Sequence, residues 1–275
     1  RDRSPSRGLG DVYKRQCLYF HDMEQLLPFL IVCPLVALAG FVDAIAGGGG
    51  LISLPAYLMT GMPPHAAIAT NKLSSCMGTA LATFRFAMKG YMRLKETLPC
   101  VLAALIGSAL GAQLVLLVSD EPLRWIMLVI VPLTALYLLR PRSLHESDAP
   151  YPLRKTILVA SVLSWGIGIY DGFYGPGTGT FLMMGFVALV HISVNQAAGL
   201  TKSVNLATNI SALVVFLLHG QVWIVLGFVA GLFNVIGAWI GVNLFTGKGV
   251  KIVKPLMLVV LALFFIKMLV ELVVS

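Results

Sequence analysis

Three long stretches without a charged residue limit the fold of this chain more than any other feature. They are Thr97–Val118, Gly172–His191 and Gly220–Gly247. A helix needs about 20 consecutive apolar residues to cross the hydrocarbon core of a bilayer. Only 12% of all residues are charged, whereas a soluble domain carries about twice that share. We therefore predict an all-α polytopic membrane protein, with the lipid bilayer as its surroundings.

The first residues of the chain differ from the rest. Residues 1–16 are polar and hold five Lys or Arg and two Asp, without the apolar core of a signal peptide. We interpret 1–22 as a non-native leader, with the natural start at Met23. From there on, 15 Lys/Arg stand against 9 Asp/Glu, so the net charge of +8 falls to +6. This excess lies in loops, where it indicates orientation in a membrane and not binding to nucleic acid.

An internal repeat divides the chain into two halves. At an offset of 130 positions the matches include Lys72 with Lys202, Gly90 with Gly220, Gly107 with Gly237 and Gly111 with Gly241. Asp43 and Asp171 match at an offset of 128. Leu and Val matches are common in membrane sequences, but Gly, Lys and Asp matches in the same order are not. We therefore predict two transmembrane repeats, 23–139 and 156–275, joined by a cytoplasmic linker over 140–155.

Each half contains five apolar segments. In the first half they lie near 26–46, 51–60, 66–88, 97–118 and 123–139. In the second half they lie near 156–174, 179–190, 196–218, 220–246 and 252–273. The second segment of each half is shorter than the roughly 20 residues of a full span. It is either re-entrant or one part of a helix that is broken inside the membrane.

The charges of the loops predict that the two halves are inverted relative to each other. Lys and Arg mark the loop 89–95, the linker and the loop 248–254, which we expect on the cytoplasmic side. The repeat partner of the first loop, 219–221, is nearly uncharged, and the partner of the third, 119–121, is acidic. Corresponding loops therefore face opposite sides of the membrane.

Each half also carries an aspartate followed by a glycine-rich segment. Asp43 precedes Gly47, Gly48, Gly49 and Gly50, and Asp171 precedes Gly175, Gly177, Thr178 and Gly179. Carboxylates and unwound backbone are costly in hydrocarbon unless protein or a cavity surrounds them. Both segments lead into an apolar segment, and the N–H groups at such a helix start favour an anion. The alternative is that the glycines only allow helices to pack closely.

Two lysines extend this pattern, because each lies near the start of the third segment of its half. Lys72 follows Asn71, and Lys202 follows Thr201. A lysine at a helix end can simply extend its ammonium group to the membrane surface. The repetition favours a site for a small oxyanion between the halves. The predicted substrate-binding residues are Gly47, Gly48, Gly49, Gly50, Asn71, Lys72, Gly175, Gly177, Thr178, Thr201 and Lys202.

The two aspartates need a separate explanation, because a bare carboxylate repels an anion. Either each aspartate pairs with a lysine, or burial keeps it protonated. In the second case Asp43 and Asp171 would couple transport to protons. Intramembrane Asn205, Asn209 and Asn234 are interpreted as amides that bond between helices.

At these motifs the chain resembles the TauE/SafE family of sulfite exporters, also called TSUP. The resemblance rests on Asp43 with Gly47–Gly50 and Asn71-Lys72, and on Asp171–Gly179 with Thr201-Lys202. It implies a secondary transporter of the bacterial inner membrane that exports sulfite, an organosulfonate or a related small anion and is driven by the proton gradient. We expect no catalytic residue, no cofactor and no metal site. The oligomeric state is open.

Two other functions compete with this one. A passive anion channel would use the same residues and differ only in lacking coupling to a gradient. An intramembrane aspartyl protease would explain an aspartate next to Tyr170 in a membrane helix. The latter chemistry needs a Gly-x-Gly-Asp sequence, which is absent around Asp43, and it has no use for two matched lysines.

Overall fold

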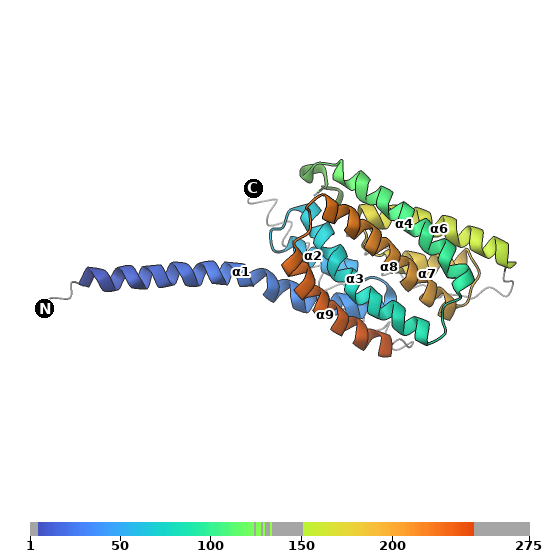
Figure 1. Ribbon diagram of the computed structural model, residues 1–275, viewed down its shortest axis with the longest axis horizontal. Coiled ribbons are helices and arrows are strands. Elements are labelled where there is room, and N and C mark those ends of the chain that lie inside the picture. Colours follow the sequence, from blue (N-terminus) through green and yellow to red (C-terminus); the bar gives the residue numbers. More distant parts are fainter. Residues whose placement is uncertain (1–4, 124, 128, 130–132, 134–150, 245–275) are drawn as a thin grey trace.

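The computed structural model describes residues 5–123, 125–127, 129, 133 and 151–244, with side chains from Leu26 onward. All regular secondary structure in this part of the chain is helical (Figure 1). The helices are α1 (Pro5–Ala46), α2 (Gly50–Leu58), α3 (Pro64–Met88), α4 (Leu94–Leu116), α6 (Leu153–Phe173), α7 (Thr178–Ala188), α8 (Val194–Leu218) and α9 (Ile224–Asn243). The predicted all-α fold is confirmed.

Five of the described helical stretches are long and apolar enough to cross a membrane. They are Leu26–Ala46 of α1, α4, α6, α8 and α9. The first part of α1 extends away from the bundle, which the other helices form together with the end of α1 (Figure 1). The predicted segments 123–139 and 252–273, and most of the linker 140–155, lie outside the described residues.

The helices of the second half repeat those of the first. Helices α3 and α8 both have 25 residues, and they begin at Pro64 and Val194, which are 130 positions apart. Helices α4 and α9 begin at Leu94 and Ile224, at the same offset. The short helices α2 and α7 are the second element of each half. The orientation of the two halves in a membrane, and whether α2 and α7 re-enter or cross, stay predictions.

One predicted boundary was wrong for a local reason. The segment predicted over 220–246 begins as a helix only at Ile224. Gly220 has a φ of +65°, and its repeat partner Gly90 has a φ of +72°. These left-handed values favour glycine and place a turn between the helices. The turn takes up the first four positions of the segment.

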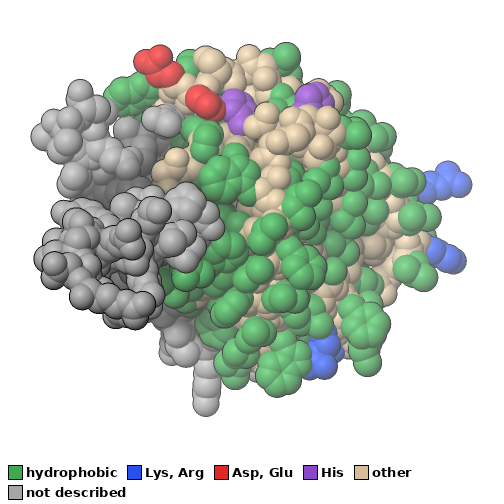
Figure 2. Space-filling view, turned by 60° about the vertical axis from the view of Figure 1, so that its left-hand side comes forward, with side chains coloured by type: hydrophobic (Ala, Val, Ile, Leu, Met, Phe, Trp, Pro, Cys, Tyr) green, Lys and Arg blue, Asp and Glu red, His purple; other side chains and the backbone are tan. Residues whose placement is uncertain are grey.

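The two halves interleave in the bundle and do not form separate lobes. Helix α4 of the first half packs against α6 and α8, and α9 of the second half packs against α1 and α3. Helices α3 and α8 pack against each other at the centre. Apolar side chains cover much of the described surface in Figure 2, whereas Asp, Glu and His lie near its upper edge and Lys and Arg at the right-hand edge and lower right. This distribution is typical of a surface that faces lipid.

Glycines bring the interleaved helices together at matching places. A Cβ atom at Gly107 or Gly111 of α4 would overlap carbonyl oxygens of α6. A Cβ atom at Gly237 or Gly241 of α9 would likewise overlap carbonyl oxygens of α1. Small residues at these positions let the helix backbones touch, so these four glycines act in packing.

Candidate functional site

The two glycine-rich segments interrupt the helices and meet at the centre of the molecule. The first lies between α1 and α2, and the second between α6 and α7. Gly47 has a φ of +75°, and Gly175, its repeat partner, has a φ of +96°; both values favour glycine. A Cβ atom at Gly47 would overlap the backbone of Gly179, and one at Gly179 would overlap Gly47. The two breaks in the helices are therefore in direct backbone contact.

Each buried lysine forms an ion pair with the aspartate of the other half. Lys72 Nζ donates to Asp171 Oδ2 at 2.6 Å, and the side chains are 2% and 3% exposed. Lys202 Nζ lies 2.9 Å from Asp43 Oδ2 and also donates to the backbone carbonyl of Asp43. In this second pair the side chains are 5% and 18% exposed. The lysines thus bind carboxylates inside the bundle and do not extend to the membrane surface.

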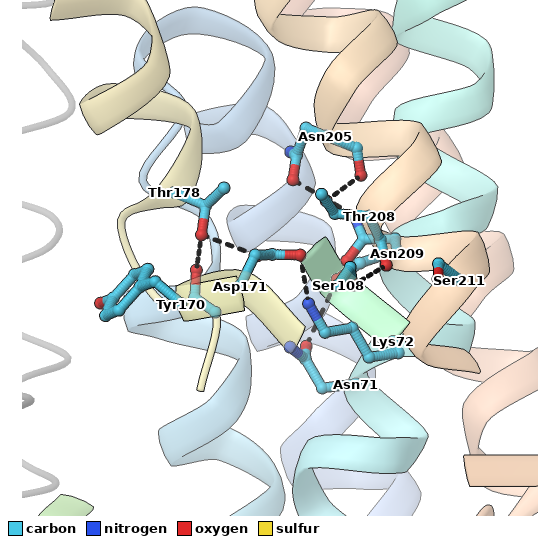
Figure 3. A network of polar contacts seen from close by, with 12 residues as sticks. Asn71, Lys72, Ser108, Tyr170, Asp171, Thr178, Asn205, Thr208, Asn209 and Ser211 are labelled. Carbon is cyan, nitrogen blue, oxygen red and sulfur yellow. Dashed lines mark hydrogen bonds and ion pairs between the residues drawn. The ribbon is translucent and has the colours of Figure 1, made fainter. Parts of the chain in front are cut away.

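Asp171 has a second partner, because Thr178 begins α7 directly beside it. Thr178 Oγ1 lies 2.7 Å from Asp171 Oδ1 and 2.7 Å from the carbonyl oxygen of Gly175. Figure 3 shows Asp171 between Thr178 and Lys72. Thr180, also in the first turn of α7, donates to the carbonyl of Ala46 at the end of α1 at 2.6 Å. Side-chain hydrogen bonds thus hold each end of the second break in place.

A polar cavity of about 430 Å³, its open mouth included, lies next to the buried pair. Its lining residues are Ala39, Asp43, Gly47, Gly49, Gly50, Ser53, Asn71, Lys72, Ser75, Thr79, Asp171, Gly175, Thr178, Gly179, Asn205, Asn209 and Asn234. Most of the predicted site residues are therefore brought together here.

Four predicted site residues do not line this cavity: Gly48, Gly177, Thr201 and Lys202. Lys202 is nevertheless connected to it through Asp43, which does. Thr201 is 2% exposed, and its hydroxyl has no hydrogen-bond partner among the described residues. Gly177 has a φ of +86° and precedes the first residue of α7.

The sequence interpretation missed the part of the cavity wall that comes from three asparagines. Asn205 and Asn209 of α8 and Asn234 of α9 line the cavity. The expected hydrogen bonds between helices are not formed among the described residues. Instead Asn209 Nδ2 donates to Asn205 Oδ1, one turn away on the same helix, at 3.4 Å. The spacing from Lys202 to Asn205 and Asn209, three and seven residues, places these two asparagines on the helix face of Lys202 and is the signal that could have found them.

The geometry bears on the chemistry that the site can perform. An aspartyl protease needs two carboxylates that share a proton, but Asp43 and Asp171 each bind a lysine. In the described part of the chain no three His, Cys, Asp or Glu residues lie so that they could hold a metal ion. What the cavity offers is an ammonium group, hydroxyl groups and amide groups, all able to donate hydrogen bonds to an anion.

A multi-pass helical protein with a polar cavity between two interleaved halves belongs to the class of membrane transporters. The model of the sulfite exporter TauE/SafE family matches residues 32–268, and the chain belongs to this family. No solved structure matches the chain.

Bacterial relatives carry transporter names. The "Probable membrane transporter protein ORF9" of Sinorhizobium sp is 40% identical over 250 residues, which are 89% of this chain and 91% of the relative. The "Probable membrane transporter protein YfcA" of Escherichia coli K12 is 36% identical over 253 residues, 91% of this chain and 93% of the relative. A "Probable membrane transporter protein" of Haemophilus influenzae is 34% identical over 221 residues, 80% of this chain and 86% of the relative. The chain is accordingly a multi-pass protein of the bacterial membrane.

Proposed function

We propose that this protein is a secondary transporter that exports a small anion, such as sulfite or an organosulfonate, across the bacterial inner membrane. The observation that carries the proposal is the crossed pairing of Lys72 with Asp171 and of Lys202 with Asp43. Paired charges inside a membrane protein are costly and mark pathways for ions or substrates. Here they lie at two touching helix breaks beside a polar cavity.

The ion pair at the cavity provides a way to bind an anion reversibly. Lys72 and Asp171 both line the cavity, so an anion that enters competes with the Asp171 carboxylate for the ammonium group. Thr178 gives Asp171 an alternative hydrogen-bond donor, which helps to satisfy the carboxylate when Lys72 turns to the anion. Binding that moves Lys72 from the carboxylate to another oxyanion keeps the ammonium group paired, but it leaves the Asp171 carboxylate without a counter-ion unless Asp171 takes up a proton.

Protons enter the proposal through the same competition. When Asp171 takes up a proton it releases Lys72, so the protonated site binds an anion more tightly. By linkage the bound anion also favours the protonated state by the same factor. A monovalent anion and one proton would then cross together without net charge movement. An anion that accumulates inside the cell would leave down its own gradient, and the inward proton gradient would oppose this export instead of driving it.

The repeat supplies a mechanism for alternating access. In transporters built from inverted repeats, the site lies at the interface of the repeats near the middle of the membrane and opens to one side at a time. The contact between Gly47 and Gly179 would link the two breaks, so that a movement of one half changes the other.

The test is the flux of labelled sulfite into proteoliposomes under an imposed pH gradient. We expect saturable flux that rises when the pH gradient favours the movement of protons with the anion. Asp171→Asn should make the remaining flux independent of that gradient. Lys72→Ala should abolish the flux of sulfite.

Two results would contradict parts of this proposal. Flux that is unaffected by the pH gradient and by Asp171→Asn would remove protons from the mechanism. Flux that does not saturate, and that is not accelerated by unlabelled sulfite on the opposite side, would favour a passive channel. Ser164→Ala serves as the control, because Ser164 is fully buried, bonds to the carbonyl of Ala160 and does not line the cavity.

A further inference from the structure

The cavity wall contains one amide group that the internal repeat does not explain. Asn205 and Asn209 on α8 correspond to Ser75 and Thr79 on α3, and all four line the cavity. Asn234 on α9 also lines it, but the residue at its repeat position on α4 is Ala104. That alanine is fully buried within an apolar cluster.

Two glycines make the space that the Asn234 side chain occupies. A Cβ atom at Gly78 of α3 would overlap Asn234 Oδ1, and a Cβ atom at Gly40 of α1 would lie 2.7 Å from the same atom. At the repeat-related position of Gly78 the chain has Thr208, so the repeat does not reproduce the Gly78 side of this space. Oδ1 is the amide atom that lies against both glycines, so we infer that Nδ2 is the amide atom available to a ligand in the cavity.

Asn234 also lacks a partner for its amide group. Its side chain belongs to a residue that is 5% exposed, and it forms no hydrogen bond with the described residues. An amide that is nearly covered, lines a cavity and has no hydrogen-bond partner among the described residues is available to a ligand that enters the cavity.

We propose that Asn234 is a substrate-binding residue, which donates a hydrogen bond from Nδ2 to an oxygen of the oxyanion held by Lys72. This inference rests on the proposed transport function and narrows its substrate class. Lys72 on α3, Asn205 on α8 and Asn234 on α9 supply donors from three helices. Three donors in one small cavity suit an anion with three oxygens on one atom, such as sulfite or a sulfonate, better than a carboxylate with two or a chloride ion with none.

The experiment measures the concentration dependence of sulfite flux in proteoliposomes for the wild type, Asn234→Ala and Asn234→Leu. Loss of a hydrogen bond to a charged ligand raises the apparent KM by about 10- to 100-fold. The maximal rate should change much less. Leucine has nearly the shape of asparagine, so Asn234→Leu keeps the space between the glycines filled, and its melting temperature should equal or exceed that of the wild type.

Selectivity provides a second measurement. In the wild type, unlabelled methanesulfonate should inhibit sulfite flux at lower concentrations than acetate, which is smaller and has one oxygen fewer. In both Asn234 variants this preference should decrease. Ser164→Ala should leave both the KM and the preference unchanged.

The outcomes separate this inference from the proposed function. If the wild type transports sulfite and Lys72→Ala abolishes the flux, but both Asn234 variants keep the wild-type KM and preference, the role of Asn234 is overturned and the transporter stands. If the wild type shows no saturable flux of sulfite or methanesulfonate, both proposals fall. If neither Asn234 variant yields folded protein, the amide acts in packing and this inference is overturned.

Discussion

At the scale of single residues, the two ion pairs are related by the repeat but lie in different surroundings. Lys72 and Asp171 are both nearly inaccessible, and they line the cavity. Asp43 is 18% exposed, and Lys202 does not line the cavity. Solvent reduces the cost of leaving a charge unpaired, so the two pairs should respond differently when one partner is removed.

This difference leads to a prediction for stability. Lys72→Ala leaves the Asp171 carboxylate buried without its partner, and should lower the free energy of unfolding by about 3–5 kcal/mol. Lys202→Ala should cost less, because water reaches Asp43. Thermal unfolding of the purified protein in detergent measures the loss of stability in both variants.

The double variant Lys72→Ala/Asp171→Ala is the control for that prediction. With both charges removed, much of the stability should return, while sulfite flux stays absent. If the double variant is as unstable as Lys72→Ala, the loss comes from packing and not from an unpaired charge.

The four charged residues of the site could be found from the sequence, but their partners could not. Asp43 and Lys72 lie in one half, Asp171 and Lys202 in the other, and pairing within a half is equally compatible with the pattern. Which carboxylate reaches which ammonium depends on how the halves interleave, and this depends on long-range packing. The cavity-lining face of α9 was missed because its polar residue, Asn234, has no asparagine at the corresponding position of the other half, so the repeat gave no signal for it.

At the scale of helices and loops, the contact between the two helix breaks is the feature that most constrains the site. Gly47 combines a left-handed φ with direct contact to Gly179. Gly61, in the loop after α2, has a similar φ of +80° but no atom within 4 Å of an added Cβ. The chain thus contains a matched control for the effect of crowding at the break.

We therefore expect Gly47→Ala and Gly61→Ala to differ. A left-handed φ costs an alanine about 1–2 kcal/mol, and Gly61→Ala should lose that amount and keep full transport. Gly47→Ala should lose roughly a further 1–3 kcal/mol from overpacking against Gly179, together with its transport activity. Thermal unfolding and sulfite flux measure these effects, and equal behaviour of the two variants would contradict a tight contact between the breaks.

The bounds of the helices followed from the sequence to within a few residues. The glycine-rich segments ended the preceding helices where the aspartate motifs predicted, and the apolar segments 66–88 and 196–218 located α3 and α8. The predicted first residues of the helices were less accurate, because polar residues at the start of a helix resemble those of a loop. Helix α4, for example, begins at Leu94, whereas the apolar segment was predicted from position 97 and Lys95 was counted with the loop.

At the scale of the whole molecule, the proposed inversion of the halves can be tested with two equivalent positions. Lys89 and His219 follow the ends of α3 and α8, and both are exposed. With inverted halves, Lys89→Cys should react with a membrane-impermeant maleimide only from the cytoplasmic side. His219→Cys should react only from the outside.

Intact cells and inside-out vesicles give the two sides of this measurement. The natural cysteines Cys33, Cys76 and Cys100 are buried, and Cys17→Ser removes the fourth. As a control, both introduced cysteines should react with the maleimide when the protein is in detergent, where the reagent reaches both sides. If both label from the same side of the membrane, the halves are parallel, and the alternating-access mechanism proposed above is wrong.

The crossed pairing also has a consequence for biosynthesis. The chain is made from its N-terminus, so Asp43 and Lys72 enter the membrane before Asp171 and Lys202 have been synthesised. An uncompensated charge at the bilayer centre costs about 2.5–3.5 kcal/mol. We therefore expect the helices of the first half to reach their final positions only after α8 has been synthesised. Until then the insertion apparatus would have to keep Asp43 and Lys72 out of contact with lipid.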